Sequence, residues 1–275
     1  MHPVLQNKAT PRTDPAKISI VTLSFNQRDY LQEAMDSVLS QGYSNLEYIV
    51  VDPGSIDGSR ELVSSYGKRI AHAIFEPDSG AADGLNKGFA LATGDIYGFL
   101  NADDLLYPGS LNRVSRFFEE HPDCDMVMGD GYKIDSQGQP IRHYSARDFS
   151  VPHYFYGGTQ WLQQSTFFRA EAFKRSPGFN LNNRTCWDGE LFVHIANQGA
   201  KIGYVRADLA GFRIHEASIS GSGRLNEQYQ QDCRRIFRQL RGHDWGTTDE
   251  ILRFLYRAEG LLKGLMRLPA RKSPA

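Results

Sequence analysis

Short apolar segments of strand length alternate with segments of helical periodicity through the first half of this chain. Strands are predicted at about 18–23, 46–51, 70–75, 96–100 and 126–128. Helices are predicted between them, where apolar residues recur every three or four positions, at about 31–39, 57–66, 82–92 and 110–120. This alternation predicts an α/β fold, with a mostly parallel, Rossmann-like sheet that helices cover on both faces.

The alternation ends near Asp130. The stretch from Gly131 to Arg169 is rich in turn-forming and aromatic residues, which predicts a smaller antiparallel part. A helix at about 187–197, short strands up to His215 and two C-terminal helices are expected after it. We predict a disordered lead-in at 1–16, one domain at 17–220 with halves 17–130 and 131–220, and C-terminal helices within 221–275.

The composition is that of an ordinary globular protein. Of 275 residues, 40% are apolar and 23% are charged, and the net charge of −1 predicts no attraction to nucleic acid. Three cysteines without metal-site spacing (Cys124, Cys186 and Cys233) suit a reducing compartment. The N-terminus lacks a signal-like apolar segment and no run of eighteen apolar residues occurs, so we expect a cytoplasmic protein.

Polar side chains follow four consecutive predicted strands. They are Thr22, Ser24 and Asn26, then Asp52 and Asp57, then Glu76 and Asp78, and finally Asn101, Asp103 and Asp104. One polar strand end is most simply a helix cap. Four of them argue for a small-molecule site, because the carboxyl ends of parallel strands meet at one edge of a sheet.

Asp103 and Asp104 are adjacent carboxylates directly after a strand that is expected to be buried. They repel each other unless a cation or hydrogen-bond donors compensate. Oxygen ligands of this kind suit Mg²⁺ or Mn²⁺. The alternative is a solvated turn before the helix near Ser110, and these two residues alone leave both interpretations open.

Several other nucleotide and hydrolase sites are excluded by their missing motifs. No GxxxxGK[ST] loop is present, which excludes a P-loop ATPase. Neither Gly129–Gly131 nor Gly221–Asn226 completes GxGxxG after the first strand, so a dinucleotide dehydrogenase is not expected. No GxSxG elbow is present either.

The order of the motifs resembles that of the family 2 glycosyltransferases of GT-A fold. The resemblance covers roughly Lys17 to Ser220. Its motifs are Thr22–Asn26, Val51–Gly58, Glu76–Gly80, Leu85–Gly88, Ala92–Asp95, Leu100–Asp104, Gln164–Arg169, Trp187–Leu191 and Phe212–Ser218. Each motif is weakly specific alone, and the ordered set is highly specific.

This resemblance implies an inverting transfer of a sugar from a nucleotide-sugar donor, with a UDP-sugar as the first expectation, to an acceptor hydroxyl. It implies Mn²⁺ or Mg²⁺ as cofactor, a donor half at 17–130, an acceptor half at 131–220 and a role in cell-envelope polysaccharide synthesis. One alternative is a sugar-1-phosphate nucleotidyltransferase, although Thr22–Arg28 lacks the Gly-rich, Arg-containing loop of such enzymes. The other is a glycan-binding module with a dead site.

The resemblance also assigns residue roles. The residues implied in donor binding are Thr22, Ser24, Asn26, Asp52, Asp78, Lys87 and Asp103, the last of which would meet ribose or sugar hydroxyls. Asp104 would bind the metal, and His215 would complete the metal or diphosphate site. The sequence departs from the usual pattern at Pro53 and Ile56, and on the acceptor side at Gly189 and His194.

A carboxylate must accept the proton of the acceptor hydroxyl during inverting transfer. Asp188, at the start of a predicted helix, is the candidate base. The alternatives are that Asp188 only stabilises the helix N-terminus, or that Glu190 is the base.

The C-terminal segment from Ile251 to Leu268 is predicted to be a basic amphipathic helix. Its apolar residues are Ile251, Leu252, Leu255, Leu262, Leu265 and Met266, and its basic residues are Arg253, Arg257, Lys263 and Arg267, followed by Arg271 and Lys272. Such a helix can lie on the inner face of an anionic membrane, where lipid-linked acceptors reside. The simpler alternative is that it packs on the catalytic domain.

Overall fold

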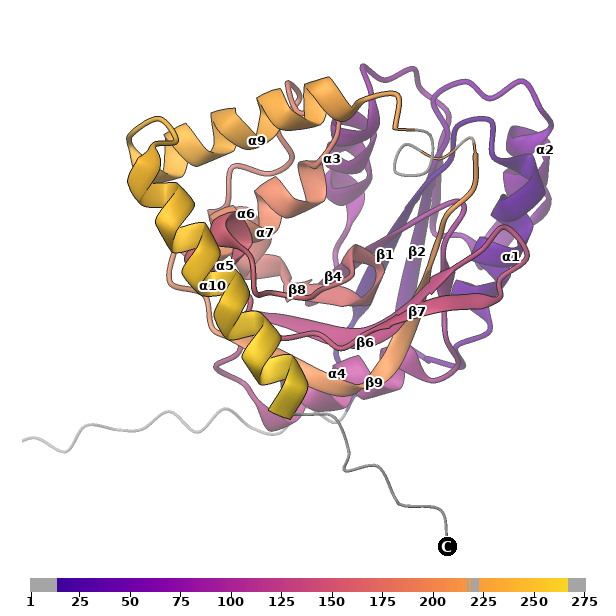
Figure 1. The fold of residues 1–275 in the computed structure, drawn as a ribbon. Helices are drawn as coiled ribbons and strands as arrows, with labels where there is room; N and C mark the ends of the chain where they lie inside the picture. The colour runs from indigo at the N-terminus through magenta and orange to yellow at the C-terminus, as the bar shows by residue number, and fades with distance from the viewer. Residues whose placement is uncertain (1–13, 217, 219–222, 267–275) are drawn as a thin grey trace, which may run out of the picture.

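A computed structural model describes residues 14–216, 218 and 223–266 (Figure 1). Nine strands of the described chain form one sheet in the order β3-β2-β1-β4-β8-β6-β9-β5, and β7 pairs with β6. The strands are β1 Ile18–Leu23, β2 Leu46–Val51, β3 His72–Ile74, β4 Ile96–Asn101, β5 Leu105–Leu106, β6 Met126–Ile134, β7 Pro140–Tyr144, β8 Thr166–Arg169 and β9 Ile202–Arg213. The expected α/β class is confirmed.

Helices cover both faces of this sheet. They are α1 Arg28–Leu39, α2 Ser59–Ser65, α3 Ala81–Leu91, α4 Ser110–Glu120, α5 Val151–Tyr156, α6 Ala170–Arg175, α7 Trp187–Asn197, α9 Asn226–Arg241 and α10 Thr247–Met266, with 3-10 turns η1 Gly67–Arg69 and η2 Gln163–Ser165. Successive side chains of a strand point to opposite faces. Ile20 of β1 therefore packs with α1, α2 and α4, whereas Val21 packs with α3, α6 and α7.

The nucleotide-side half follows the prediction closely. β3, β2, β1 and β4 lie side by side and are parallel to one another, as the helical connections between them require. β8 then lies antiparallel between β4 and β6, so the antiparallel part expected after Gly131 is present. β6 continues past Asp130 to Ile134, and one long strand, β9, replaces the short strands expected before His215.

Two short helices were not predicted from the sequence. The turn-rich pattern did not indicate α5 or α6, which are one to two turns long. The expected C-terminal helices are α9 and α10, which meet at a turn and lie on the outside of the molecule near α5 and α7 (Figure 1). The lead-in predicted at 1–16 lies almost wholly outside the described residues, and the domain division stays a prediction. No helix in the described ranges is both long and apolar enough to cross a membrane.

Glu47 on β2 joins three segments that lie side by side at one end of the sheet. Its carboxylate accepts hydrogen bonds from the Ser19 hydroxyl of β1 and from the backbone N–H of Thr93, both at 2.6 Å. The Lys17 ammonium group lies 2.6 Å from the same carboxylate. Burial acts to raise the pKa of Glu47, but the hydrogen bonds from Lys17, Ser19 and Thr93 outweigh it and lower the pKa to about 2.

Replacing Glu47 by alanine should therefore destabilise the fold by about 2–3 kcal/mol at pH 7, since hydrogen bonds to a charged group are lost. Urea unfolding measures this. The folded-state pKa is lowered, so the contribution is present above the ordinary glutamate pKa of about 4.3 and is lost as the pH falls toward 2. Glu61→Ala, on the exposed side of α2, is the matched control, and an equal loss in both variants would contradict the role of Glu47.

Candidate active site

A cavity of about 1420 Å³ opens beside the carboxyl ends of β1 and β4. Ser24, Asp78, Asn101 and Asp103 line it from the strand ends, and Trp187 and Asp188 line it from the start of α7. Residues of α9 and α10 line its remaining wall. Polar residues at the ends of β1, β3 and β4 thus converge as predicted, whereas the end of β2 contributes only Pro53 to the lining, and the cavity also reaches the C-terminal helices.

Two polar atoms at the end of β1 and β2 are buried without a hydrogen-bond partner among the described residues: the Ser24 hydroxyl and Oδ2 of Asp52. The other oxygen of Asp52 accepts the backbone N–H groups of Gly54 at 3.2 Å and Ser55 at 2.8 Å. An unsatisfied buried polar group costs roughly 1–3 kcal/mol, so both atoms fit a site where a bound molecule supplies the partner.

Thr22 and Asn26 do not line the cavity: Thr22 joins strands β1 and β2, and Asn26 joins the loops that follow them. The fully buried Thr22 hydroxyl accepts the Tyr48 hydroxyl at 3.0 Å. Asn26 has a left-handed φ of 52°, and its side-chain oxygen accepts the N–H of Ile56 at 3.0 Å. The Asn26 contact fixes the loop that carries the exposed Ile56, and donor binding by Thr22 and Asn26 stays a prediction.

Asp78 in the loop before α3 and Lys87 on α3 were both predicted to bind the donor, but only Asp78 lines the cavity. Asp78 lines the cavity and accepts the N–H of Gly80 at 2.9 Å, and burial raises its pKa. The Lys87 ammonium group instead donates to the Pro77 carbonyl at 2.5 Å and lies 3.7 Å from Asp83. It does not line the cavity.

Asp103 lines the cavity and pairs with His215, which does not itself line it. Nε2 of His215 lies 3.0 Å from Oδ2 of Asp103, and the His215 ring packs against Tyr30 with centroids 4.7 Å apart. No group of three or more His, Cys, Asp or Glu side chains in the described part of the chain is arranged to hold a metal. Two protein ligands nevertheless fit Mg²⁺ or Mn²⁺, which take their other ligands from water and substrate phosphates.

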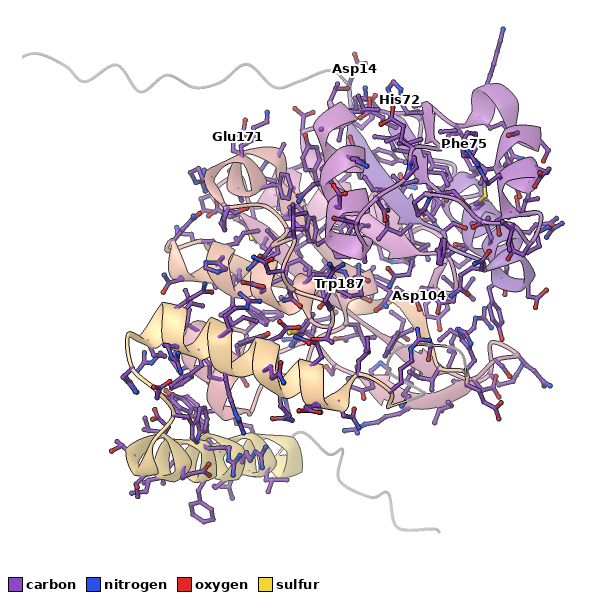
Figure 2. All side chains as sticks on the ribbon, turned by 90° about the horizontal axis from the view of Figure 1, so that it is seen from above. Asp14, His72, Phe75, Asp104, Glu171 and Trp187 are labelled. Carbon is purple, nitrogen blue, oxygen red and sulfur yellow. The ribbon has the colours of Figure 1, made fainter. Side chains whose placement is uncertain are left out.

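Asp104 does not line the cavity and is only 1% exposed. One carboxylate oxygen accepts the backbone N–H of Arg213 at 2.8 Å. The other accepts the side-chain amides of Gln164 at 2.7 Å and Asn101 at 3.1 Å. Burial and the neighbouring Asp103 raise the pKa of Asp104. Figure 2 labels Asp104 and Trp187 near the middle of the molecule, whereas Glu171 lies at its edge. This geometry favours Asp103 over Asp104 as the metal ligand.

Arg213 supports the same loop and was not among the predicted site residues. Its buried guanidinium donates to the Asp103 carbonyl at 2.7 Å and to Glu33 of α1 at 2.7 Å. Both Arg213 and Gln164 stand within motifs that resemble the family. Their spacing gives no sign that they hold the Asp103–Asp104 segment, because the contacts span up to 180 residues.

Asp188 lines the cavity from the first turn of α7. Its Oδ1 accepts the N–H of Gly189 at 2.7 Å, and burial raises its pKa to about 6. A carboxylate with that pKa is ionised at neutral pH and is a better proton acceptor than an ordinary aspartate, so the geometry suits a base.

The Glu190 side chain lies on another face of α7, where neighbouring side chains pair with it. Its buried carboxylate makes a bidentate pair with Arg235 of α9 at 2.6 and 2.8 Å and accepts the side-chain amides of Asn180 and Asn183 at 2.9 and 2.7 Å. Burial acts to raise the pKa of Glu190, but these partners lower it. The geometry therefore favours Asp188 over Glu190 as the base.

Neighbouring residues explain the two departures from the family pattern on α7. A Cβ on Gly189 would lie 2.5 Å from the Tyr154 hydroxyl, so the Tyr154 ring occupies the space that a larger residue would need. His194 lies 4.0 Å from Glu190, and Arg235 supplies a closer cation from α9. Among the cysteines, Cys186 and Cys233 line the cavity, while Cys124 is buried elsewhere.

A family model described as glycosyl transferase family 2 matches residues 19–175. The chain belongs to glycosyl transferase family 2. Glycosyltransferase GlyG of Streptococcus pneumoniae is 31% identical over 218 residues, which cover 74% of this chain and 72% of GlyG. An uncharacterized glycosyltransferase of Nostoc sp. is 28% identical over 226 residues, or 77% of this chain and 70% of that protein. The predicted family is confirmed.

TuaG of Bacillus subtilis, a putative teichuronic acid biosynthesis glycosyltransferase, is 37% identical over 128 residues, which cover 45% of this chain and half of TuaG. Among solved structures, Staphylococcus aureus TarS 1–349 with UDP-GlcNAc superposes with a TM-score of 0.65 at 16% identity, covering 91% of this chain and 73% of that one. The mannosyltransferase PcManGT of Pyrobaculum calidifontis with GDP-Man and Mn²⁺ gives 0.63 at 17% identity, covering 94% and 77%. These similarities confirm that the glycosyltransferase has the expected GT-A fold.

Proposed function

We propose that this glycosyltransferase moves a sugar, with inversion, from a nucleotide-sugar donor to an acceptor hydroxyl during assembly of a cell-envelope polysaccharide. The observation that carries the proposal is that one cavity is lined both by Asp103, which pairs with His215, and by the half-buried Asp188. A cation site and a general base are the two groups that such a transfer needs. The similarity to TuaG supports the polysaccharide role, and the UDP-GlcNAc bound to TarS supports a UDP-sugar as donor.

The donor would lie along the strand ends. Asp52 and Ser24 each hold a buried oxygen that the described residues leave unpartnered, and a nucleoside offers N–H and O–H groups to both. Asp78 lines the same wall, where sugar or ribose hydroxyls can donate to it. Thr22, Asn26 and Lys87 would act by holding this wall in place.

Asp103 and His215 would hold Mn²⁺ or Mg²⁺, and the Mn²⁺ of PcManGT supports this cofactor. When bound, the cation would neutralise negative charge on the leaving diphosphate. Asp104 and Arg213 would fix the loop that presents Asp103. This assignment gives Asp103 the metal-binding role that the motif resemblance implied for Asp104, and gives Asp104 a structural role instead.

Asp188 would accept the acceptor proton. The acceptor oxygen forms a bond to the anomeric carbon while the bond from that carbon to the diphosphate breaks, and the hydroxyl proton passes to the Asp188 carboxylate. Family membership favours this reaction over nucleotidyl transfer. The intact Asp103, His215 and Asp188 favour an active enzyme over a glycan-binding module.

The C-terminal helix would place the enzyme at a membrane. One face of α10 packs on α5, where a Cβ on Gly260 would lie 2.8 Å from Gly158. The opposite face exposes Ile251, Phe254, Leu255, Leu261 and Leu262, each by at least 54%. An apolar helix face followed in the sequence by basic residues suits an anionic bilayer. Those residues, Arg267, Arg271 and Lys272, lie outside the described ranges.

The metal assignment predicts that Asp103→Ala and His215→Ala lose transfer by about 10²-fold or more, because charge on the leaving group is no longer stabilised. EDTA should have the same effect, and Mn²⁺ should no longer tighten nucleoside diphosphate binding in isothermal titration. Asp104→Asn should instead lower the free energy of unfolding by about 1–3 kcal/mol. The asparagine NH₂ group would face the N–H groups that donate to the Asp104 carboxylate. If Asp104→Asn loses Mn²⁺ binding at full stability while Asp103→Ala keeps it, Asp104 is the ligand.

The base assignment predicts that Asp188→Asn keeps donor affinity and loses turnover by about 10²–10⁴-fold. Wild-type turnover should fall about tenfold per pH unit below pH 6, because a protonated Asp188 cannot accept a proton. Glu190→Gln is the control: it should keep turnover and unfold at lower urea concentration. Retention of more than about a tenth of the turnover in Asp188→Asn would place the base elsewhere.

The membrane assignment predicts that the protein sediments with anionic phospholipid vesicles and less so with zwitterionic ones. Replacing Phe254 and Leu261 by serine should abolish sedimentation without changing turnover on a soluble acceptor, because both side chains are exposed. Leu91→Ser, at an exposed leucine of α3, is the matched control. Equal sedimentation of all three proteins would rule out this face as the contact.

A further inference from the structure

The wall of the cavity formed by α9 and α10 is rich in arginine. Arg234 and Arg238 line it from α9, and Arg253 and Arg257 line it from α10. We call these four residues the arginine arm. Both helices lie on the outside of the molecule (Figure 1).

Opposite charges are separated within this one cavity. The strand ends and the start of α7 contribute the carboxylates Asp78, Asp103 and Asp188. Two carboxylates line the cavity beside the arginine arm, and each pairs with an arginine of the arm. Asp244 lies 2.5 Å from Arg238, and Glu250 lies 2.5 Å from Arg253.

Arg234 and Arg257 remain without a carboxylate partner among the residues that the structure describes. The aliphatic part of Arg257 lies over Gly157, where an added Cβ would be 3.0 Å from its Cγ, so the side chain is supported along its length. Gly157 has a φ of 96°, a conformation that glycine adopts readily. Two cations without carboxylate partners at the edge of a cavity favour an anionic ligand.

Aromatic side chains line the cavity beside the arginine arm. They are Phe155, Tyr229, Phe237 and Trp245. Trp245 packs against Phe237 with ring centroids 4.8 Å apart, and the Arg253 guanidinium lies 5.8 Å from the Trp245 ring. Tyr229 is 46% exposed. Ring faces offer apolar contact to the C–H faces of sugars, so the arm combines contacts for sugar rings with contacts for anions.

The arm lies on the acceptor side of the site. The proposed function places the donor and its diphosphate at the strand ends, and Asp188 at the acceptor hydroxyl. The α9–α10 wall is then where the rest of the acceptor extends. A volume of about 1420 Å³ exceeds the roughly 300–1,000 Å³ of a typical small-molecule pocket and leaves room for both substrates.

We propose that the arginine arm is an acceptor subsite for a glycan that carries phosphate or carboxylate groups. This inference rests on the proposed glycosyl transfer for the direction in which the acceptor lies. The net charge of the whole chain is −1, so the positive charge is local to the arm and does not reflect a generally basic surface.

Binding can be measured by tryptophan fluorescence, because all three tryptophans of the chain, Trp161, Trp187 and Trp245, line the cavity. The probes are an oligomer of glycerol phosphate, an oligogalacturonate and a neutral malto-oligosaccharide. We expect tighter binding of one or both anionic oligomers than of the neutral one. Comparison of the two identifies phosphate or carboxylate as the group recognised. The preferred affinity should fall as salt rises, since exposed charges are screened.

The double variant Arg234→Gln/Arg257→Gln should bind the preferred anionic oligomer about tenfold more weakly, because two charge-assisted contacts are lost. Its affinity for nucleoside diphosphate with Mn²⁺ should be unchanged. Arg116→Gln, at an exposed arginine of α4, is the matched control and should bind both ligands as the wild type does.

Equal binding of neutral and anionic oligomers, or an unchanged affinity in the double variant, would overturn the proposal. Binding to anionic vesicles alone, lost in the double variant, would make the arm a lipid headgroup site and would also overturn it. Failure of nucleoside diphosphate to bind the wild type would count against the proposed function instead, and the oligomer titrations would still decide the role of the arm.

Discussion

The buried Asp104 carboxylate connects the three segments on which the site depends. It accepts hydrogen bonds from Asn101 at the end of β4, Gln164 of η2 and the backbone of Arg213 at the end of β9. A buried carboxylate is stable only where donors satisfy it, and these donors come from elements far apart in the chain. Once they are in place, Asp103 is held at the cavity wall beside His215. The same constraint gives two neighbouring aspartates different tasks, one structural and one open to a ligand.

The cavity has an acidic part and a basic part, and the two follow from different elements. Loops after parallel strands bring Asp78 and Asp103 to one edge of the sheet, whereas α9 and α10 bring arginines from the C-terminal third. Asp188 lies on α7 between these groups of elements in the chain. Its burial raises its pKa to about 6, which suits a group that must take a proton at neutral pH. Glu190 illustrates the opposite environment, because Arg235 and two asparagines hold it ionised.

Local pattern predicted the first half of the fold well. The bounds of β1, β2 and α4 agree with the predicted segments, because the two strands are short apolar runs that end at polar residues and the helix has a clear period of three to four. The periodicity of apolar residues did not predict the elements after Asp130 correctly. β6 continues there because it pairs with β7 and β9, and α5 forms where Ser150 caps it and α10 packs on it. The pairing with β9 and the packing of α10 bring together residues that lie far apart in the chain, which a local window does not contain.

The sequence by itself determined the order of the motifs, and with it the family, the α/β class and the group of acidic residues from which the site is built. Only the tertiary structure decided which member of each acidic pair faces the cavity. Asp103 and Asp104, like Asp188 and Glu190, are close in sequence and alike in chemistry. Their roles differ because β9 and η2 bury one member of the first pair, and α9 supplies an arginine to one member of the second. The arginine arm has the same origin, since Arg234 and Arg257 become neighbours of one cavity only when α9 and α10 turn back onto the domain. Spacing along a chain sets the period of a helix or strand, but burial and charge pairing are set by segments that meet only in the folded protein.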